Sequence, residues 1–259
     1  MNSSSPPFLF NSFEAALTSC FTGGYEYQKL VDVIIGKNKI LQDSIPPINE
    51  FDFGAMRTIM AVGLALGEAK KIKVLDFGGG GGYHWLIAKS AFSQDINFDW
   101  RIIETELMAK AGSQFLAQEG LQFFSNIKSS LKVGEKLDLV FTSSTIQYCQ
   151  APLKALEELV DLGARYLFIT RTPFSLSQLL LVSSQRSMLS ENGPGPMPKE
   201  FQDEAIDYPI SYVPKNDAIR IIQRKYDIRF SLKEEPGNLF IGDIPVNNYY
   251  GFFCELKKS

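Results

Sequence analysis

A run of five glycines, Gly78–Gly82, constrains the fold more than any other feature of the sequence. The residues before it, Lys71–Phe77, have the apolar pattern of a buried strand, and residues 83–93 have that of a helix. Each glycine costs about 0.5–1 kcal/mol of backbone entropy relative to alanine, so five in succession indicate a turn that approaches something closely. A strand, a glycine turn and a helix form the ligand-binding unit of open parallel sheets.

The alternation of short apolar segments with amphipathic ones continues downstream. Further strands are expected at 98–103, 121–124, 137–142, 166–170, 228–232 and 249–256. Further helices are expected at 107–118, 152–161 and 217–226. Strands that alternate with helices indicate a mainly parallel sheet covered on both faces, with right-handed crossovers. The predicted fold class is therefore α/β, doubly wound and Rossmann-like.

Two stretches depart from this alternation. Residues 1–70 are mainly helical in pattern and are expected to form a helical N-terminal cap ahead of a domain at 71–259. Within this cap, disorder is expected at 1–8, a break at Pro46-Pro47, and helices at 13–20, 27–35 and 55–69. Residues 172–214 are rich in turn formers and are expected to form an irregular insertion, with one helix near 176–189.

The spacing of the glycines separates the ligand classes that such a loop binds. The dinucleotide fingerprint G-x-G-x-x-G requires a small residue at its sixth position. Whichever glycine begins the count, that position is bulky, being Tyr83, His84 or Trp85. The phosphate-binding P-loop pattern is missing too, because no Gly-Lys-Ser/Thr follows. The pattern that fits is D-x-G-x-G-x-G, formed by Asp76, Gly78, Gly80 and Gly82, with Gly79 inside it.

Polar residues at the ends of later strands are further candidates for ligand contacts. Glu104 ends the second strand, where a carboxylate can accept hydrogen bonds from both hydroxyls of a ribose, each worth about 1.5–3 kcal/mol. Glu106 is the nearby alternative. Asn126 follows the third strand and can accept a hydrogen bond from an adenine amino group through its side-chain carbonyl. Ser143 lies at the exit of the fourth strand, at the same edge of the sheet.

Composition narrows the class of protein. The 259 residues include 26 basic and 29 acidic ones, and no basic block indicates nucleic-acid binding. The cysteines Cys20, Cys149 and Cys254 are widely separated, which disfavours a zinc site or a disulfide framework and suits a reducing cytoplasm. The first residues lack the pattern of a secretory signal, and the apolar stretches are too short to span a bilayer. A cytoplasmic protein without a metal site is expected.

Several segments together resemble the class I S-adenosylmethionine-dependent methyltransferases. More narrowly, the chain is similar to a group of bacterial methyltransferases sometimes encoded near polysaccharide-biosynthesis genes. The segments that carry the likeness are 23–26, 75–80, 100–104, 143–148 and 170–173. The resemblance implies S-adenosylmethionine as the cofactor, and a mainly parallel seven-stranded sheet with an antiparallel last strand. It also implies a small-molecule acceptor, of saccharide or lipid-linked type, in place of nucleic acid.

The resemblance also assigns residues to the two ligands. The cofactor contacts that it implies are Asp76, Gly78, Gly79, Gly80, Gly82, Glu104, Asn126 and Ser143. Tyr25 is placed on the N-terminal cap over the cofactor, and Arg171 near the acceptor. The residue at 126 departs from the family pattern, which has an acid there, and this leaves the adenine contact open.

Methyl transfer is an in-line displacement at a sulfonium carbon, so the protein mainly aligns the reactants, an effect of up to about 7–11 kcal/mol. A hydroxyl acceptor also requires a general base. The sequence identifies no base; its candidates for catalytic roles are His84, Tyr148 and Arg171, and a structural or cofactor-side role is favoured for His84. O-methylation of a small-molecule or saccharide-type acceptor is expected. Two alternatives stay open: an NAD(P)-dependent oxidoreductase, and a non-catalytic protein that binds S-adenosylmethionine.

Overall fold

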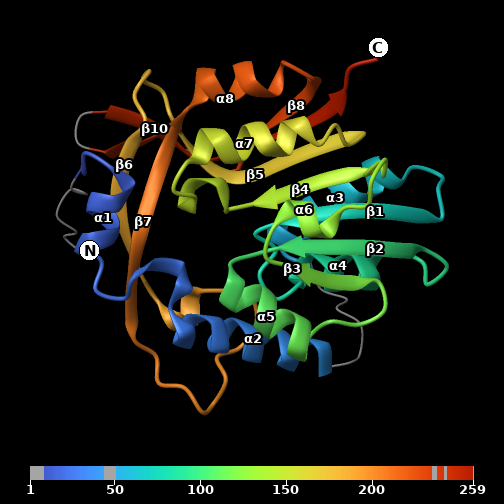
Figure 1. Ribbon diagram of the computed structural model, residues 1–259, viewed down its shortest axis with the longest axis horizontal. Coiled ribbons are helices and arrows are strands. Elements are labelled where there is room, and N and C mark those ends of the chain that lie inside the picture. The colour runs from blue at the N-terminus through green and yellow to red at the C-terminus, as the bar shows by residue number, and fades with distance from the viewer. Residues whose placement is uncertain (1–8, 44–50, 235–237, 242–243, 259) are drawn as a thin grey trace.

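The computed structural model describes residues 9–43, 51–234, 238–241 and 244–258, which Figure 1 shows as a ribbon. The disorder predicted for residues 1–8 and the break predicted at Pro46-Pro47 lie outside the described residues. In the described part, strands of one sheet run through the middle of the molecule with helices on both sides (Figure 1).

The central path of the sheet has the strand order β3-β2-β1-β4-β5-β10-β8. The bounds of these strands are β1 Lys71–Phe77, β2 Asn97–Ile103, β3 Leu121–Phe124, β4 Leu139–Ser143, β5 Tyr166–Ser175, β8 Tyr226–Lys233 and β10 Ile244–Leu256. The strands β1 to β5 of this path pair in parallel, whereas β10 runs antiparallel to both β5 and β8. The predicted mainly parallel sheet with an antiparallel last strand is confirmed.

The strand order reverses between β1 and β4. From β1 the chain continues outward to β2 and β3, and it then returns to β4, on the other side of β1, and continues to β5. Such a reversal opens a crevice at the carboxyl ends of the two central strands, where open α/β sheets bind their ligands. The glycine run follows β1 directly, so the topology places it in this crevice.

Helices cover both faces of the sheet, as predicted. One face carries α3 (Phe53–Leu66), α4 (Tyr83–Ala91) and α5 (Glu106–Phe115), and the other carries α7 (Pro152–Asp161) and α8 (Lys215–Ile222). Successive side chains of a strand point to opposite faces, so Val74 packs in the core with α4 and Leu75 in the core with α7. The helix α2 (Gln28–Asp43) lies beside α5, and the short α6 (Ile127–Ser130) follows β3.

The first helix, α1 (Phe13–Ser19), begins where the sequence predicts. The Ser12 hydroxyl accepts a hydrogen bond from the Ala15 amide at 3.1 Å, which satisfies one of the free donors of the first turn. The helix packs against β6 and β7, while α3 packs against α4 and β1. The division of the chain at residue 70 into a cap and a larger domain stays a prediction.

The helix predicted near 176–189 is wrong. That stretch contains β6 (Leu181–Met188), which pairs antiparallel with β7 (Ala205–Pro214); the end of β7 joins β5 in parallel. Leu176, Leu179 and Leu180 at the start of that stretch are exposed in the turn before β6. The residues of β6 pair with residues 17 to 31 positions further along the chain, and local periodicity does not report such a partner.

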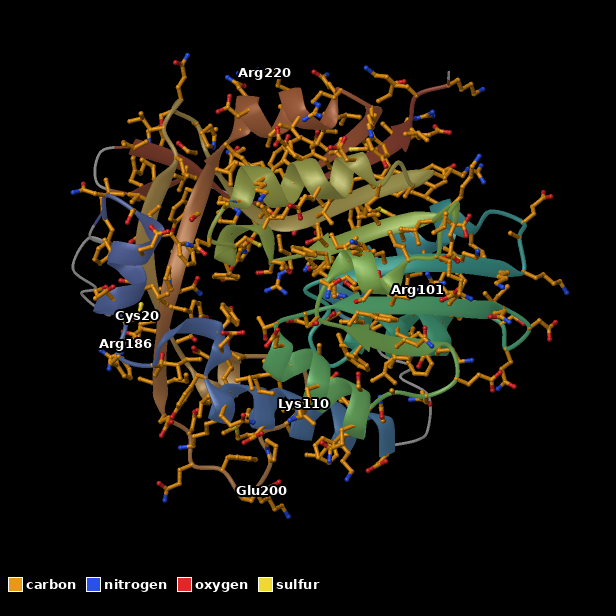
Figure 2. The ribbon with its side chains drawn as sticks, viewed as in Figure 1. Cys20, Arg101, Lys110, Arg186, Glu200 and Arg220 are labelled. Carbon is orange, nitrogen blue, oxygen red and sulfur yellow. The ribbon has the colours of Figure 1, made fainter. Side chains whose placement is uncertain are left out.

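The C-terminal strands are longer than predicted. β10 begins at Ile244 instead of 249, and its first residues pair with an unpredicted strand, β9 (Asn238–Ile241). With β6, β7 and β9 attached, the sheet of the described residues has ten strands where seven were predicted. Arg186 of β6 lies over the ring of Phe21, which follows α1 closely in the chain, and Figure 2 labels Arg186 at the same edge of the molecule as Cys20. No helix among the described residues is long and apolar enough to cross a membrane.

Candidate functional site

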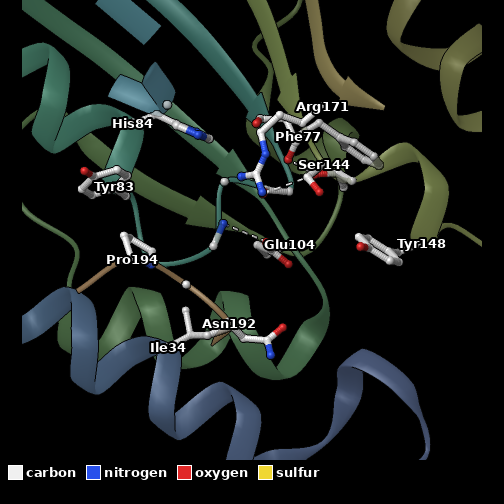
Figure 3. Close-up of a pocket in the computed structure, with 18 of the residues that line it drawn as sticks. Ile34, Phe77, Tyr83, His84, Glu104, Ser144, Tyr148, Arg171, Asn192 and Pro194 are labelled. Carbon is white, nitrogen blue, oxygen red and sulfur yellow. Dashed lines mark hydrogen bonds between the residues drawn. The ribbon is translucent and has the colours of Figure 1, made fainter. Parts of the chain in front are cut away.

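A cavity of about 1150 Å³ opens at the carboxyl ends of the parallel strands (Figure 3). The glycine loop after β1 lines it, together with Glu104 at the end of β2, Ser143 at the end of β4 and Arg171 in the neighbouring part of β5. The other walls come from the start of α3, the 3-10 turn η1 (Gly24–Glu26), the β6–β7 pair and the turn at 191–195. Segments from the whole length of the chain meet here, so the cavity is the candidate ligand site.

The glycine loop has the conformation that the sequence pattern predicts. Gly78, Gly80 and Gly82, the three glycines of D-x-G-x-G-x-G, have φ angles of 74°, 56° and 91°, in the left-handed region that disfavours other residues. The two between them are limited by close approach: a Cβ on Gly79 would lie 2.6 Å from Asp76 Oδ2, and one on Gly81 would lie 2.4 Å from Asn38. Three of the five glycines therefore follow from backbone conformation, and the other two follow from the lack of room for a side chain.

Glu104 lies at the end of β2 and faces the loop across the cavity (Figure 3). Its Oε1 accepts a hydrogen bond from the Gly80 amide at 2.9 Å, and its Oε2 accepts one from the Thr105 amide at 3.1 Å. Burial raises the pKa of Glu104, and the two amide hydrogen bonds oppose that rise. The carboxylate is thus held at the loop, as the prediction of a ribose contact requires.

Asp76 has no exposed surface and does not line the cavity. It lies beneath Gly79, where its Oδ2 is 2.9 Å from His84 Nδ1 and accepts a hydrogen bond from Trp100 Nε1 at 3.1 Å, while its Oδ1 has no hydrogen-bond partner among the described residues. The cofactor contact that was predicted for Asp76 therefore stays a prediction. The structure shows in addition that Asp76 contacts His84. His84 itself lines the cavity, with its ring 4.6 Å from that of Phe141.

This arrangement predicts the tautomer of His84. A carboxylate within hydrogen-bond distance of Nδ1 requires a proton on Nδ1, so the neutral ring should carry none on Nε2. His84 is the only histidine in the chain, and ¹⁵N NMR of the labelled protein at high pH therefore reports it alone. A protonated Nε2 in the neutral ring would show that Asp76 does not orient the imidazole.

The remaining predicted cofactor residues do not all meet at the cavity. Ser143 and Tyr25 line it. Asn126 instead caps α6, where its Oδ1 accepts a hydrogen bond from the Ser129 amide at 2.9 Å, and it borders a separate cavity of about 620 Å³. Gly82 is the N-cap of α4 and lies outside the lining. The adenine contact assigned to Asn126 thus stays a prediction that the main cavity does not support.

Three tyrosines form one wall of the cavity. The ring centroids of Tyr25, Tyr148 and Tyr208 lie 4.5–5.3 Å apart, and the Tyr148 hydroxyl donates to Gln185 Oε1 at 3.0 Å. Burial raises the pKa of Tyr148, so at neutral pH this candidate is a protonated hydrogen-bond donor. The wall joins the N-terminal turn η1 to β7, which the sequence alone does not bring together.

The turn over the glycine loop is fixed by a buried lysine. Lys37 of α2 is fully buried, and its Nζ donates hydrogen bonds to the backbone oxygens of Ser190 at 2.6 Å, Asn192 at 2.9 Å and Gly193 at 3.2 Å. Burial lowers the pKa of this lysine. The contact explains why residues 192–195, which lie in the Gly-Pro-rich part of the predicted insertion, form a wall of the site.

Sequence reasoning missed a charged network at the β5 side of the cavity. Glu234, whose side chain is 3% exposed, accepts hydrogen bonds from the Thr170 hydroxyl and the Arg171 amide, and Arg57 NH1 lies 3.5 Å from its Oε2. Arg57, Thr170 and Glu234 all line the cavity. They come from α3, β5 and the end of β8, and no local motif connects segments so far apart in the chain.

Metal-ligating side chains do not gather in the part of the chain that the structure describes: no group of three or more His, Cys, Asp or Glu residues is placed to hold an ion. The three cysteines have free thiols. The chemistry that the described site offers is that of carboxylates, guanidinium groups, hydroxyls and one imidazole.

No protein-family model matches the sequence, and no curated protein matches it significantly. Among solved structures, an S-adenosylmethionine-dependent methyltransferase from Clostridium acetobutylicum matches with a TM-score of 0.49 and 10% identity over 90% of this chain and 99% of its own. The N-methyltransferase NodS from Bradyrhizobium japonicum, solved with S-adenosyl-L-homocysteine, matches with a TM-score of 0.47 and 10% identity, over 86% of this chain and 100% of its own. The magnesium protoporphyrin IX methyltransferase from Synechocystis matches with a TM-score of 0.47 and 13% identity, over 81% of this chain and 89% of its own. Likeness at this level says nothing about what the present chain binds.

Proposed function

We propose that the chain is an S-adenosylmethionine-dependent methyltransferase that acts on a small-molecule acceptor. The observation that carries the proposal is a pair of carboxylates at the glycine loop: Glu104 in front of Gly80, and Asp76 beneath Gly79. A carboxylate at the end of β2 suits the two hydroxyls of a ribose. Two negative charges at one loop suit a ligand that brings a positive charge, as a sulfonium does.

The same pair of carboxylates disfavours the NAD(P) alternative. A dinucleotide places its pyrophosphate at the loop and the first turn of the following helix. Asp76 lies directly under the loop here, and its carboxylate would repel a pyrophosphate strongly because the site is buried away from water. The side chains of Tyr83 and His84 also line the cavity at the first turn of α4, where the dinucleotide fingerprint requires a small residue.

The residues of the site can also supply the proton transfer that a hydroxyl acceptor needs. The cofactor, when bound, supplies a methyl group on a positively charged sulfur; transfer breaks that carbon–sulfur bond and forms a carbon–oxygen bond to the acceptor. We place the acceptor proton on His84 Nε2, because Asp76 holds Nδ1 and would stabilise the resulting imidazolium. O-methylation of a saccharide-type acceptor, predicted from the sequence, remains part of this proposal.

A transfer assay separates the proposed enzyme from a protein that binds the cofactor without turnover. The chain is incubated with S-adenosylmethionine labelled in its methyl group and with a panel of hydroxyl-bearing saccharides, both neutral and anionic. We expect label in one acceptor and release of S-adenosylhomocysteine in equal amount. Tight cofactor binding with no S-adenosylhomocysteine released from any member of the panel would favour the non-catalytic alternative.

A further inference from the structure

Two residues other than glycine adopt the left-handed backbone conformation among the described residues, and they are neighbours in the site. Ser144, which follows the end of β4, has a φ of 55°, and Arg171, which lies within β5, has a φ of 53°. The Ser144 amide donates to the Thr170 oxygen at 3.0 Å, which joins the two positions. Each such conformation costs about 1–2 kcal/mol, and strain of this kind concentrates at functional sites.

The backbone of Arg171 is held on both sides. Its amide donates to the two carboxylate oxygens of Glu234 at 3.1 and 3.2 Å. Its carbonyl oxygen accepts a hydrogen bond at 3.2 Å from Nε2 of Gln147, a fully buried residue that also donates to Ser144 Oγ at 3.0 Å. These contacts stabilise the strained conformation and so set the direction in which the Arg171 side chain leaves the strand.

The guanidinium of Arg171 extends into the cavity (Figure 3). It lies 5.5 Å from the ring of Tyr249, and it has no carboxylate partner among the described residues. The charge of Glu234 is opposed by Arg57, whose NH1 lies 3.5 Å away. The salt bridges of the described residues therefore leave the guanidinium of Arg171 without an ion-pair partner.

The other carboxylates that line the cavity are each committed to backbone amides. Asp52 accepts a hydrogen bond from the Ala55 amide at 2.7 Å, and Glu191 accepts one from the Met188 amide at 2.8 Å. Glu104 accepts those of Gly80 and Thr105. None of these groups pairs with Arg171, so an anionic group on a ligand is the partner that this guanidinium lacks.

The place of Arg171 in the sheet indicates which ligand carries that anion. Neighbouring strands lie about 4.8 Å apart, and β5 is separated from β1 by β4. Arg171, which lies in β5 beside the end of β4, is therefore about 10 Å from β1 and the glycine loop and about 14 Å from the strand that ends at Glu104. A cofactor whose ribose lies at Glu104 reaches the β4 region with its methyl group, and the acceptor lies beyond it, toward β5.

We infer that the acceptor carries a carboxylate or a phosphate group, which Arg171 binds through its planar guanidinium. This inference rests on the proposed function, because that function places the cofactor on the β1–β2 side. It narrows the acceptor to an anionic small molecule, such as a sugar acid or a sugar phosphate. Arg171 is then a specificity-determining residue, held in place by Glu234 and Gln147.

The test measures binding of small anions to the chain saturated with S-adenosylhomocysteine. The probes are glucuronate, glucose 6-phosphate and inorganic phosphate, with glucose as the neutral control. Arg171→Gln removes the charge, and Arg171→Gly removes the side chain while suiting the left-handed backbone, so that at least one variant should fold. Arg186→Gln is the matched control, because Arg186 also lies over an aromatic ring, that of Phe21 at 5.7 Å, and does not line the cavity.

We expect glucuronate or one of the phosphates to bind the unmodified chain, and to bind both Arg171 variants at least tenfold more weakly. The carboxylate and phosphate probes show which source of the anion is the better ligand. Binding to Arg186→Gln, and the affinity of all variants for S-adenosylhomocysteine, should not change. Equal anion binding by the Arg171 variants, or no anion binding by the unmodified chain, would overturn the inference.

Two further outcomes separate this inference from the proposed function. A drop in S-adenosylhomocysteine affinity in the Arg171 variants would mean that the guanidinium serves the carboxylate of the cofactor, which contradicts an acceptor role. An unmodified chain that binds no S-adenosylhomocysteine would overturn the proposed function first, and this inference with it. A chain that binds S-adenosylhomocysteine but none of the anions would overturn this inference alone.

Discussion

Replacing Glu104 by alanine is expected to weaken the binding of S-adenosylhomocysteine tenfold or more in a chain that stays folded. The Glu104 carboxylate, which accepts a hydrogen bond from the Gly80 amide at 2.9 Å, is also the group that we assign to the ribose. A hydrogen bond to a charged group is worth about 1.5–3 kcal/mol, and about 1.4 kcal/mol corresponds to a factor of ten in affinity. Calorimetric titration measures the loss directly.

The control for this variant is Glu106→Ala. Glu106 lies two positions further along, in the first turn of α5, and its side chain is exposed and outside the cavity. Its removal should leave the affinity unchanged. If Glu104→Ala is folded and binds S-adenosylhomocysteine as tightly as the unmodified chain does, the ribose lies elsewhere.

The pKa of Glu104 adds a pH dependence to the same result. The ionised carboxylate is the form that accepts hydrogen bonds from both hydroxyls, so affinity is full above the pKa of Glu104 and falls as the pH drops through it. Burial raises that pKa, and the loss should therefore begin at a higher pH than it would for an ordinary glutamate. Titrations at successive pH values should show this fall in the unmodified chain and not in Glu104→Ala.

Gly78→Ala is expected to destabilise the fold and to reduce cofactor binding far more than Gly134→Ala does. The two glycines share a φ of 74°, so an alanine at either meets the same left-handed strain of about 1–2 kcal/mol. At Gly134 an added Cβ contacts nothing within 4 Å, whereas at Gly78 it would lie 2.1 Å from Thr145 Oγ1. Overlap of this kind typically costs a further 1–3 kcal/mol or so.

Urea unfolding and S-adenosylhomocysteine titration of both glycine variants test this difference. The Gly78 amide donates to the Ile103 oxygen at 2.8 Å, so the loop cannot move away from Thr145 without losing its attachment to β2. A shift of the loop also moves the Gly80 amide away from Glu104. Equal destabilisation by the two substitutions would show that the approach of Thr145 to the loop does not constrain residue 78.

The glycine loop was predictable because the information for it is local. The apolar pattern of 71–77, the alternate glycines and the following helix all lie within one short segment, and the structure reproduces each of them. The sheet was predictable for a related reason: alternating strands and helices leave few ways to cover both faces. The start of the helix predicted at 13–20 was predictable because capping depends on residues three apart in the sequence, here Ser12 and Ala15.

The acceptor side of the cavity was not predictable, because its contacts join distant segments. The stretch that holds β6 was predicted as a helix, and its partner in the structure is the distant strand β7. Nothing near Glu234 in sequence indicates that it holds the Arg171 amide, 63 residues away. Asn126 was chosen from its position after the third strand, and the structure shows its side chain capping α6, so its contact with an adenine stays a prediction.

The assignment of the cofactor is tested most directly by calorimetric titration of the purified chain with S-adenosylhomocysteine and, in parallel, with NAD. The carboxylate of Glu104, placed for a ribose, predicts binding of S-adenosylhomocysteine with a dissociation constant on the order of micromolar, about −8 kcal/mol, and the buried Asp76 beneath the loop predicts no binding of NAD. Binding of NAD without S-adenosylhomocysteine would contradict the proposed function, and with it the roles given to Glu104 and Asp76.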